Sequence, residues 1–200
     1  MTTRGGLGLL GGTFDPPHVG HLVAAAQCLE QLELASVLLL VAGDPWQKSE
    51  RGSVTPAFHR VAMTRLAFEG VPGMVVDDRE VHRFGPTYTI DTVQELVDSL
   101  GEPPVLILGG DAAAGLGSWH RTEDLMGMVE LAVVDRPGAQ TGSLEDLVGN
   151  RAIHHVRMPP IDISSEDLRV RLARGGRVDG MISAQVIAYI GSHALYREPQ

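Results

Sequence analysis

Residues 7–21 read LGLLGGTFDPPHVGH, joining a short apolar run to a glycine pair and then to two histidines. The apolar run, Leu7–Leu10, is typical of a buried parallel strand, and Gly11-Gly12 ends it. From the second histidine onward, apolar residues recur at helical spacing, which predicts an amphipathic helix over about residues 21–34. Ser36–Gly43 (SVLLLVAG) is again typical of a buried strand. Together these segments predict a βαβ unit.

The remainder of the chain repeats this alternation. Further strands are predicted at Met74–Asp77, Val105–Leu108, Leu131–Val134 and Ile153–Val156, and further helices at Pro56–Phe68, Thr89–Leu100, Ser164–Ala173 and Ser183–Tyr189. Repeated βα units predict an α/β fold, a Rossmann-like doubly wound parallel sheet covered on both faces. We expect a single domain over residues 1–200 with a small C-terminal helical part at about 160–195. Two glycine-rich or polar stretches, Gly43–Thr55 and Arg79–Thr87, are predicted as mobile loops.

The composition restricts the class of protein. The 200 residues are 44% hydrophobic and 20% charged, which provides enough apolar material for a core. A single cysteine, Cys28, excludes an internal disulfide framework and a Cys-rich zinc site, and it fits a reducing compartment. No apolar run reaches the ~18 residues of a membrane span, and no signal-peptide pattern is seen. We therefore expect a cytoplasmic protein without a membrane partner.

The charge restricts the ligands. The formal net charge is −9, which argues against broad binding to nucleic acid. Of the 16 basic residues all but Lys48 are arginine, whose planar guanidinium suits bidentate contacts to phosphate and carboxylate. An anionic ligand would therefore need a small local cluster of donors.

The glycine pair and the histidines form a candidate phosphate site. Gly11 and Gly12 remove side chains where the backbone would approach a ligand, and Thr13 adds a hydroxyl and an N–H group. His18 and His21 are three residues apart at the start of a helix, an end that favours anions. Two other interpretations stay open on these residues alone. One is a tight turn before a capped helix with two surface histidines; the other is part of a metal site, although no third ligand has a suitable spacing.

Two other nucleotide-binding fingerprints fit poorly. Residues 6–11 match G-x-G-x-x-G, but they run through the predicted strand instead of following it. A Walker loop is absent, because Lys48 follows a glutamine and not a glycine. A nicotinamide-dependent dehydrogenase, in which Asp44 would bind a ribose, is kept as an alternative that cofactor absorbance would test.

The run G-G-T-F-D-P-x-H-x-G-H resembles the signature of the nucleotidyltransferase superfamily. Other segments resemble one member family, the bacterial nicotinate-nucleotide adenylyltransferases, and span nearly the whole chain in order. They are Gly43–Lys48 (GDPWQK), Thr87–Thr92 (TYTIDT), Gly109–Ala112 (GGDA), Ser118–His120 (SWH) and Ile163–Arg169 (ISSEDLR). The resemblance implies the nucleotidyltransferase α/β phosphodiesterase type of fold. It also implies transfer of AMP from ATP to nicotinate mononucleotide, giving deamido-NAD and pyrophosphate in NAD biosynthesis.

The resemblance further implies the residues that hold ATP. They are Gly11, Gly12, Thr13, Phe14, His18, His21, Asp111, Ser164, Ser165 and Arg169, among which His18, His21 and Arg169 are implied to be catalytic. The spacing of Ser164, Ser165 and Arg169 agrees with their implied role on the far side of the triphosphate. The two serines would begin a helix, and Arg169 follows one turn along the same face. An ordinary capping box beginning at Ser164 is compatible with this interpretation. The chain has Glu166 where the family usually has threonine.

The second substrate is implied to bind a different set, Asp15, Lys48, Tyr88, Thr89, Trp119 and His120. Trp119 would stack on the nicotinate ring, because a flat ring prefers an aromatic face. Backbone near Thr89 and His120 would meet the nicotinate carboxylate, and Lys48 would contact the mononucleotide phosphate.

The implied reaction needs neither a protein base nor a covalent intermediate, because the attacking phosphate oxygen is already charged near neutral pH. Mg²⁺ is expected on the ATP phosphates and not in a site built by the protein. The alternatives are another acceptor, nicotinamide mononucleotide or pantetheine phosphate, and a non-catalytic nucleotide-binding regulatory domain. A homo-oligomer is compatible with the sequence, which does not specify one.

Overall fold

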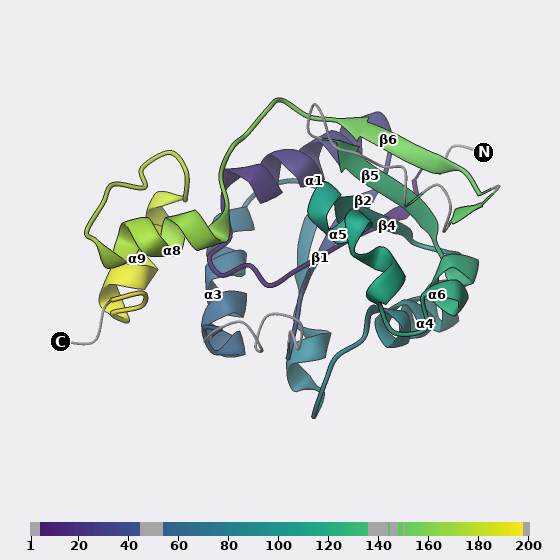
Figure 1. The fold of residues 1–200 in the computed structure, drawn as a ribbon, viewed down its shortest axis with the longest axis horizontal. Coiled ribbons are helices and arrows are strands. Elements are labelled where there is room, and N and C mark those ends of the chain that lie inside the picture. The colour runs from purple at the N-terminus through teal and green to yellow at the C-terminus, as the bar shows by residue number, and fades with distance from the viewer. Residues whose placement is uncertain (1–4, 45–53, 136–143, 145–147, 150, 198–200) are drawn as a thin grey trace.

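A computed structural model of the chain describes residues 5–44, 54–135, 144, 148–149 and 151–197. A six-stranded sheet lies at its centre, and every neighbouring pair of strands is parallel (Figure 1). The strands are β1 (Leu7–Gly12), β2 (Ser36–Val41), β3 (Met74–Asp77), β4 (Val105–Gly109), β5 (Glu130–Asp135) and β6 (Ile153–Arg157). The predicted α/β class and parallel sheet are confirmed.

The order of the strands places the candidate site. It is β3-β2-β1-β4-β5-β6, so the chain builds one half of the sheet outward from β1 and then the other half outward from β4. Ligand sites of open α/β sheets lie beyond the carboxyl ends of the strands, where the order reverses. β1 and β4 are neighbours at this reversal, and they end in Gly12 and Gly109. The glycine pairs of the sequence therefore lie at the switch point.

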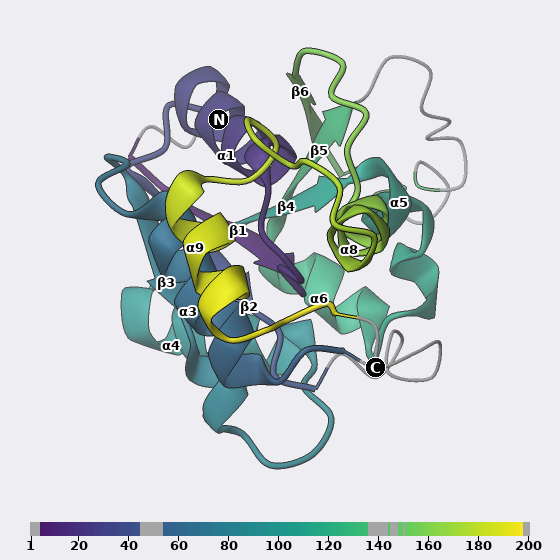
Figure 2. The same cartoon turned by 90° about the vertical axis from the view of Figure 1, so that its left-hand side faces the viewer.

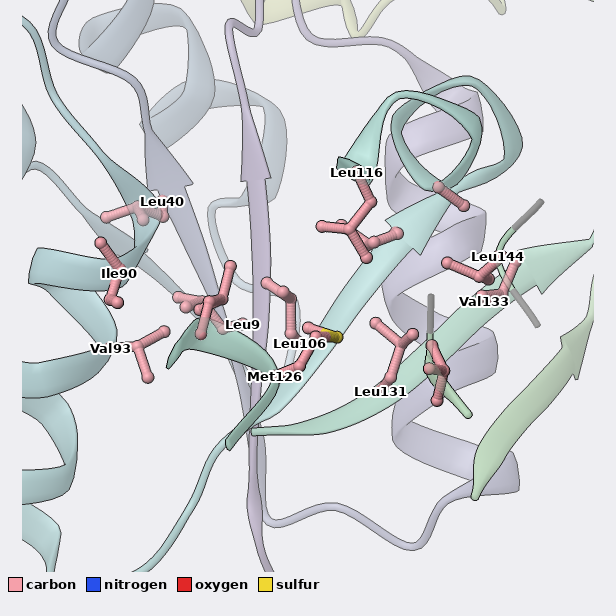
Figure 3. Close-up of a cluster of buried hydrophobic side chains, with 14 of the residues drawn as sticks. Leu9, Leu40, Ile90, Val93, Leu106, Leu116, Met126, Leu131, Val133 and Leu144 are labelled. Atoms are coloured by element: carbon pink, nitrogen blue, oxygen red, sulfur yellow. The ribbon is translucent and has the colours of Figure 1, made fainter. Parts of the chain in front are cut away.

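Helices cover both faces of the sheet. One face carries α1 (Val19–Gln31) and α3 (Ala57–Phe68); the other carries α4 (Thr89–Leu100), α5 (Gly110–Ala114) and α6 (Thr122–Met128). Because side chains alternate along a strand, Leu9 and Leu106 pack in the core beneath α4, α5 and α6, whereas Leu10 and Ile107 pack in the core beneath α1 and α3. Figure 3 shows the core on the α4–α6 face, where leucines of the strands face α4. No helix among the described residues is long and apolar enough to cross a bilayer.

Most predicted elements are confirmed, with shifted ends. The helix predicted over 21–34 is α1, which begins at Val19 because His18 is its N-cap, and ends at Gln31. β2 ends at Val41, two residues before the predicted end. The short helices α5 and α6 and the 3-10 turn η2 (Leu116–Ser118) were missed, because segments this short carry little helical periodicity.

The two predicted mobile loops differ from the prediction or lie outside the described residues. Most of Gly43–Thr55 is in the undescribed range 45–53. Arg79–Thr87 begins with a 3-10 helix, η1 (Arg79–His82), and Glu80 within it is buried. The sequence did not indicate this short helix, because the stretch is polar and its one buried side chain is a carboxylate.

Two C-terminal helices, α8 (Ser165–Ala173) and α9 (Ala184–Ser192), confirm the predicted helical part. Ser164 and Ser183 cap them through side-chain oxygens, and α9 extends three residues past the predicted end. Figure 2 shows α9 beside α3, and Met63 of α3 packs in one apolar cluster with residues of both helices. The members of that cluster that are buried are Met63, Leu168, Val178, Ile182, Val186 and Ile190.

Candidate active site

Two histidines begin α1 and cap it reciprocally. Nδ1 of His18 accepts a hydrogen bond from the backbone N–H of Gly20 at 3.1 Å, and the backbone N–H of His18 donates to Nδ1 of His21 at 3.2 Å. The two rings are tilted by 31° with centroids 3.8 Å apart. His18 is only 8% exposed, so the alternative of two surface histidines does not hold for it. The capping part of that alternative is confirmed.

These hydrogen bonds fix which ring nitrogen carries the proton. A nitrogen that accepts a backbone N–H cannot itself be protonated, so each neutral ring has its proton on Nε2. In each neutral ring the N–H group is then Nε2–H, a type of donor that can contact an anion. An anion at this helix end would meet two such donors and the positive end of the helix dipole.

The loop before the histidines is shaped by an aromatic ring. Phe14 is 1% exposed, has a left-handed backbone (φ 51°), and lies edge-on to His21 with centroids 5.0 Å apart. A Cβ on Gly12 would lie 3.0 Å from the Phe14 ring, whereas a Cβ on Gly11 would meet nothing within 4 Å. A side chain at Gly12 would press against the Phe14 ring, which would have to shift by a few tenths of an ångström, whereas the exposed Gly11 leaves the end of β1 open.

The start of α8 docks on the same loop. The hydroxyl of Ser165 donates to the carbonyl of Pro16 at 2.9 Å, and Nη1 of Arg169 donates to the carbonyl of Asp15 at 2.8 Å. Ser164 accepts from the backbone N–H of Asp167 at 3.0 Å, and its hydroxyl donates to Oδ2 of Asp167 at 2.6 Å, so the N-cap half of the predicted capping box is present. The structure therefore brings together the two predicted ATP-binding segments, which are separated by about 150 residues in the sequence.

A second cluster collects the aromatic residues of the prediction. Tyr88 precedes α4, which begins at Thr89, and the ring of Tyr88 stacks on His120 with centroids 4.2 Å apart. Trp119 is partly buried against the core beneath α4 and α6, and its carbonyl accepts from the hydroxyl of Thr122. The TYTIDT and SWH segments therefore meet. The aromatic partner of Tyr88 is His120, a pairing that the sequence did not predict.

Asp111 and Lys48 complete the predicted site residues. Asp111 lies exposed in α5, directly after β4. Lys48 is outside the described residues.

Arg60 is a structural residue of the site that sequence reasoning missed. It is 1% exposed, and its guanidinium donates to four backbone carbonyls, those of Thr13, Ala42, Gly43 and Thr55, at 2.6–3.0 Å. Burial lowers the pKa of Arg60, against the opposing charge of Asp15. The arginine joins the ends of β1 and β2 to the start of α3. The sequence pattern that could have identified Arg60 is its position on the buried face of α3, one turn before Met63.

A buried carboxylate supports the end of β2. Glu80 is 4% exposed and accepts a hydrogen bond from Thr92 at 2.8 Å. Burial raises the pKa of Glu80 above its usual range, although Thr92 and the charge of Arg83 act in the opposite direction. A Cβ on Gly43 would lie 2.2 Å from the Glu80 carbonyl, so only glycine fits there. Glu80 thereby ties the β2 loop to the start of α4.

Asp15 is buried at 3% exposure, and both of its carboxylate oxygens are occupied. Oδ2 accepts from the backbone N–H of Thr55 at 3.1 Å, and Oδ1 accepts from the hydroxyl of Tyr196 at 2.6 Å. The family resemblance assigns Asp15 to the second substrate, and in the structure its side chain is bonded to Thr55 and Tyr196. Tyr196 was not a predicted site residue, because nothing local links it to residue 15.

Comparisons with known proteins agree with this arrangement. Residues 9–171 match the model of the family described as cytidylyltransferase-like. A "Probable nicotinate-nucleotide adenylyltransferase" of Bordetella petrii is 42% identical over 96% of this chain and 98% of its own length. A protein of the same name from Leifsonia xyli is 40% identical, covering 98% and 96% of the two chains.

A solved structure supports the fold. Nicotinic acid mononucleotide adenylyltransferase of Plasmodium falciparum, complexed with NaAD, superposes with a TM-score of 0.81 over 96% of this chain and 97% of that one, at 18% identity. At that identity the likeness bears on the fold alone. By the family model and by its curated relatives together, the chain belongs to the cytidylyltransferase-like family and, within it, to the nicotinate-nucleotide adenylyltransferases.

Proposed function

We propose that this protein transfers the adenylyl group of ATP to nicotinate mononucleotide, forming deamido-NAD and releasing pyrophosphate, a step of NAD biosynthesis. One observation carries the proposal beyond family membership. The reciprocally capped His18 and His21 share a loop with the docking contacts of Ser165 and Arg169. Segments that are far apart in the sequence thus meet at the loop that follows β1.

For ATP, the proposed contacts are those that the sequence indicates. They are Gly11, Gly12, Thr13, Phe14, His18, His21, Asp111, Ser164, Ser165 and Arg169. The two imidazole rings would hydrogen-bond the polyphosphate, and the guanidinium of Arg169 would offset part of its charge, without a permanent cluster of cations. That inventory suits a protein whose net charge is −9.

In the reaction, an oxygen of the nicotinate mononucleotide phosphate attacks the α-phosphorus of ATP. A new P–O bond forms there as the bond to the β-phosphate oxygen breaks, and pyrophosphate leaves with the bonding electrons. His18, His21 and Arg169 would act by aligning the phosphates and by stabilising the charge that builds in transfer. No protein group has to remove a proton, because the nucleophile is already an anion.

The second substrate is proposed to bind where Tyr88–Thr89 meets Trp119–His120. The aromatic faces there suit a pyridine ring, and free N–H groups at the start of α4 suit its carboxylate. Lys48 is the proposed contact to the phosphate. Asp15 would support this subsite from below through the loop, since its side chain is bonded to Thr55 and Tyr196.

Mg²⁺ is the proposed cofactor, bound through the ATP phosphates and water. Within the described part of the chain no three His, Cys, Asp or Glu residues are grouped to hold a metal. Mg²⁺ prefers oxygen ligands, and the phosphate oxygens of ATP together with water would supply most of them. We further propose that the chain acts as one cytoplasmic domain, with residues 160–195 as its helical part.

The test is to incubate the pure protein with Mg-ATP and each of three acceptors, then identify the products by mass. The acceptors are nicotinate mononucleotide, nicotinamide mononucleotide and pantetheine phosphate. We expect deamido-NAD and pyrophosphate, with the highest kcat/KM for nicotinate mononucleotide. A preference for either other acceptor would change the substrate, and binding of ATP without any product would support a regulatory domain instead.

A further inference from the structure

The C-terminal segment after α9 reaches the loop that carries the two histidines. Tyr196 lies 181 residues beyond Asp15 in the sequence, yet its hydroxyl donates to Oδ1 of Asp15 at 2.6 Å. The ring packs against the α3–α8–α9 apolar cluster, and the hydroxyl also lies 3.8 Å from Sδ of Met63. Among the described residues, Tyr196 is the one side chain beyond residue 192 that is hydrogen-bonded to the loop of residues 11–16.

The backbone that delivers this tyrosine is unusual. Ala194 and Tyr196 both have positive φ angles, 51° and 61°. Residues other than glycine adopt this region only at a cost, so surrounding contacts must hold them there. For Tyr196, the apolar cluster and the hydrogen bond to Asp15 are those contacts.

Asp15 links this tyrosine to the groups proposed to bind ATP. Its other carboxylate oxygen accepts from Thr55, where the chain enters α3, and its carbonyl accepts from Arg169. A shift of residue 15 would therefore move the anchor of the Arg169 guanidinium. It would also move the loop that leads to His18, three residues later.

The Tyr196 hydroxyl remains a donor under ordinary conditions. Burial and the negative charge of Asp15 raise the pKa of the Tyr196 phenol far above its usual range, although a hydrogen bond with Thr55 and the charge of Arg169 oppose this. The hydrogen bond to Asp15 is charge-assisted and short, the kind that holds a group most firmly.

We propose that Tyr196 is a positioning residue for adenylyl transfer, acting through Asp15 to set the loop that carries His18 and the anchor of Arg169. The proposal rests on the proposed function. It assigns to the C-terminal segment a role in turnover, and to Asp15 a role in placing the ATP site in addition to supporting the second subsite.

The experiment compares Tyr196→Phe with Tyr189→Phe in steady-state kinetics and thermal unfolding. Tyr189 is a matched control, because it packs against the same apolar cluster and its hydroxyl also bonds to a side chain, but that side chain is His59 of α3, at 2.8 Å, and not Asp15. We expect Tyr196→Phe to lower kcat by about tenfold or more, and Tyr189→Phe to change it by less than about twofold. A Tyr196→Phe protein that is folded at the assay temperature and keeps its kcat overturns the proposal, since a merely structural role would lower only the melting temperature.

Asp15→Asn and the double variant test the route. If Tyr196 acts through Asp15, the double variant has the same kcat as Asp15→Asn alone; independent, multiplying losses overturn the route. An unchanged kcat in Asp15→Asn also overturns it, even if KM for nicotinate mononucleotide rises, because the route requires that loss of this carboxylate lower kcat. If Tyr196→Phe does not fold, the kcat of Asp15→Asn decides by itself. A wild-type kcat in Asp15→Asn would then refute the proposal. A wild-type protein without adenylyltransferase activity would instead refute the proposed function.

Discussion

His18 and His21 are joined by a hydrogen bond and by contact of their rings: the backbone N–H of His18 donates to Nδ1 of His21, and the tilted rings have centroids 3.8 Å apart. Adding a proton to either Nδ1 would break a bond to the backbone. It would also place a charge against the neighbouring ring. The pair therefore suits a role as two neutral donors, which can bind a polyphosphate without repelling each other.

Replacing His18 by Asn separates capping from catalysis. Asn is a good N-cap, so we expect the free energy of unfolding to change by less than about 1 kcal/mol. The loss of the Nε2–H donor should lower kcat/KM about 10²–10³-fold. His21→Ala should show a similar loss of activity. Steady-state kinetics and urea unfolding measure both effects.

The matched control for these variants is His82→Ala, because the side chain of His82 is 75% exposed and lies on η1. It should leave both activity and stability nearly unchanged. Near-normal turnover in both His18→Asn and His21→Ala would contradict the assignment of the pair.

Replacing Arg60 by Met should destabilise the protein by at least about 3 kcal/mol, because four backbone carbonyls, one buried and three part-buried, lose their donor. Urea unfolding followed by circular dichroism measures the change. Arg65→Met on the same helix is the control: that side chain is 59% exposed and pairs only at the surface with Asp78, so the expected loss is under about 1 kcal/mol. Equal losses in the two variants would show that Arg60 does not hold the loops.

Glu80 should make stability depend on pH. Because its pKa is raised above the ordinary 4.5, the folded protein keeps this proton to a higher pH than the unfolded chain does. In that window the folded state binds more protons, so the free energy of unfolding falls as pH rises, and the cost of the buried charge is fully present above it. The difference in unfolding free energy, Glu80→Gln minus wild type, should therefore become more positive from 4.5 toward neutral pH. A difference independent of pH, in unfolding curves measured across that range, would contradict this.

Replacing Gly43 by Ala should cost about 1–3 kcal/mol, because the new methyl group would overlap the backbone carbonyl of Glu80, which has little room to move. Gly127→Ala is the matched control, since a Cβ there meets nothing within 4 Å and Gly127 lies within α6. Alanine in a helix should stabilise that variant by up to about 1 kcal/mol. Thermal unfolding distinguishes the two, and equal shifts would argue against the close approach.

Replacing Trp119 by Leu retains apolar packing and removes the aromatic face. If the ring stacks on the nicotinate, KM for nicotinate mononucleotide should rise about two- to tenfold, in line with the 0.5–1.5 kcal/mol of an aromatic pair. KM for ATP serves as the internal control and should stay the same. Kinetics in which only the ATP parameter changes would place Trp119 elsewhere.

Much of the fold follows from local pattern. The run Leu7–Leu10 and the segments at Val105–Leu108 and Leu131–Val134 are too short and too apolar for anything but buried strands between helices, and all three are strands of the sheet. Short helices such as α5 and α6 escaped prediction because a turn or two of helix has no period to read. The histidine pair and the serines before Arg169 were found because their chemistry is local, at the first turns of α1 and α8.

The sequence by itself determined the alternation of strands and helices and the chemical groups at the helix starts, because both depend on neighbours within a few residues. Only the tertiary structure decided what supports them. Arg60 bonds to carbonyls of three separate segments, and Asp15 bonds to Tyr196 across 181 residues. Such contacts form only when the parallel strands bring distant loops to one edge of the sheet, and no local pattern in the chain encodes that encounter.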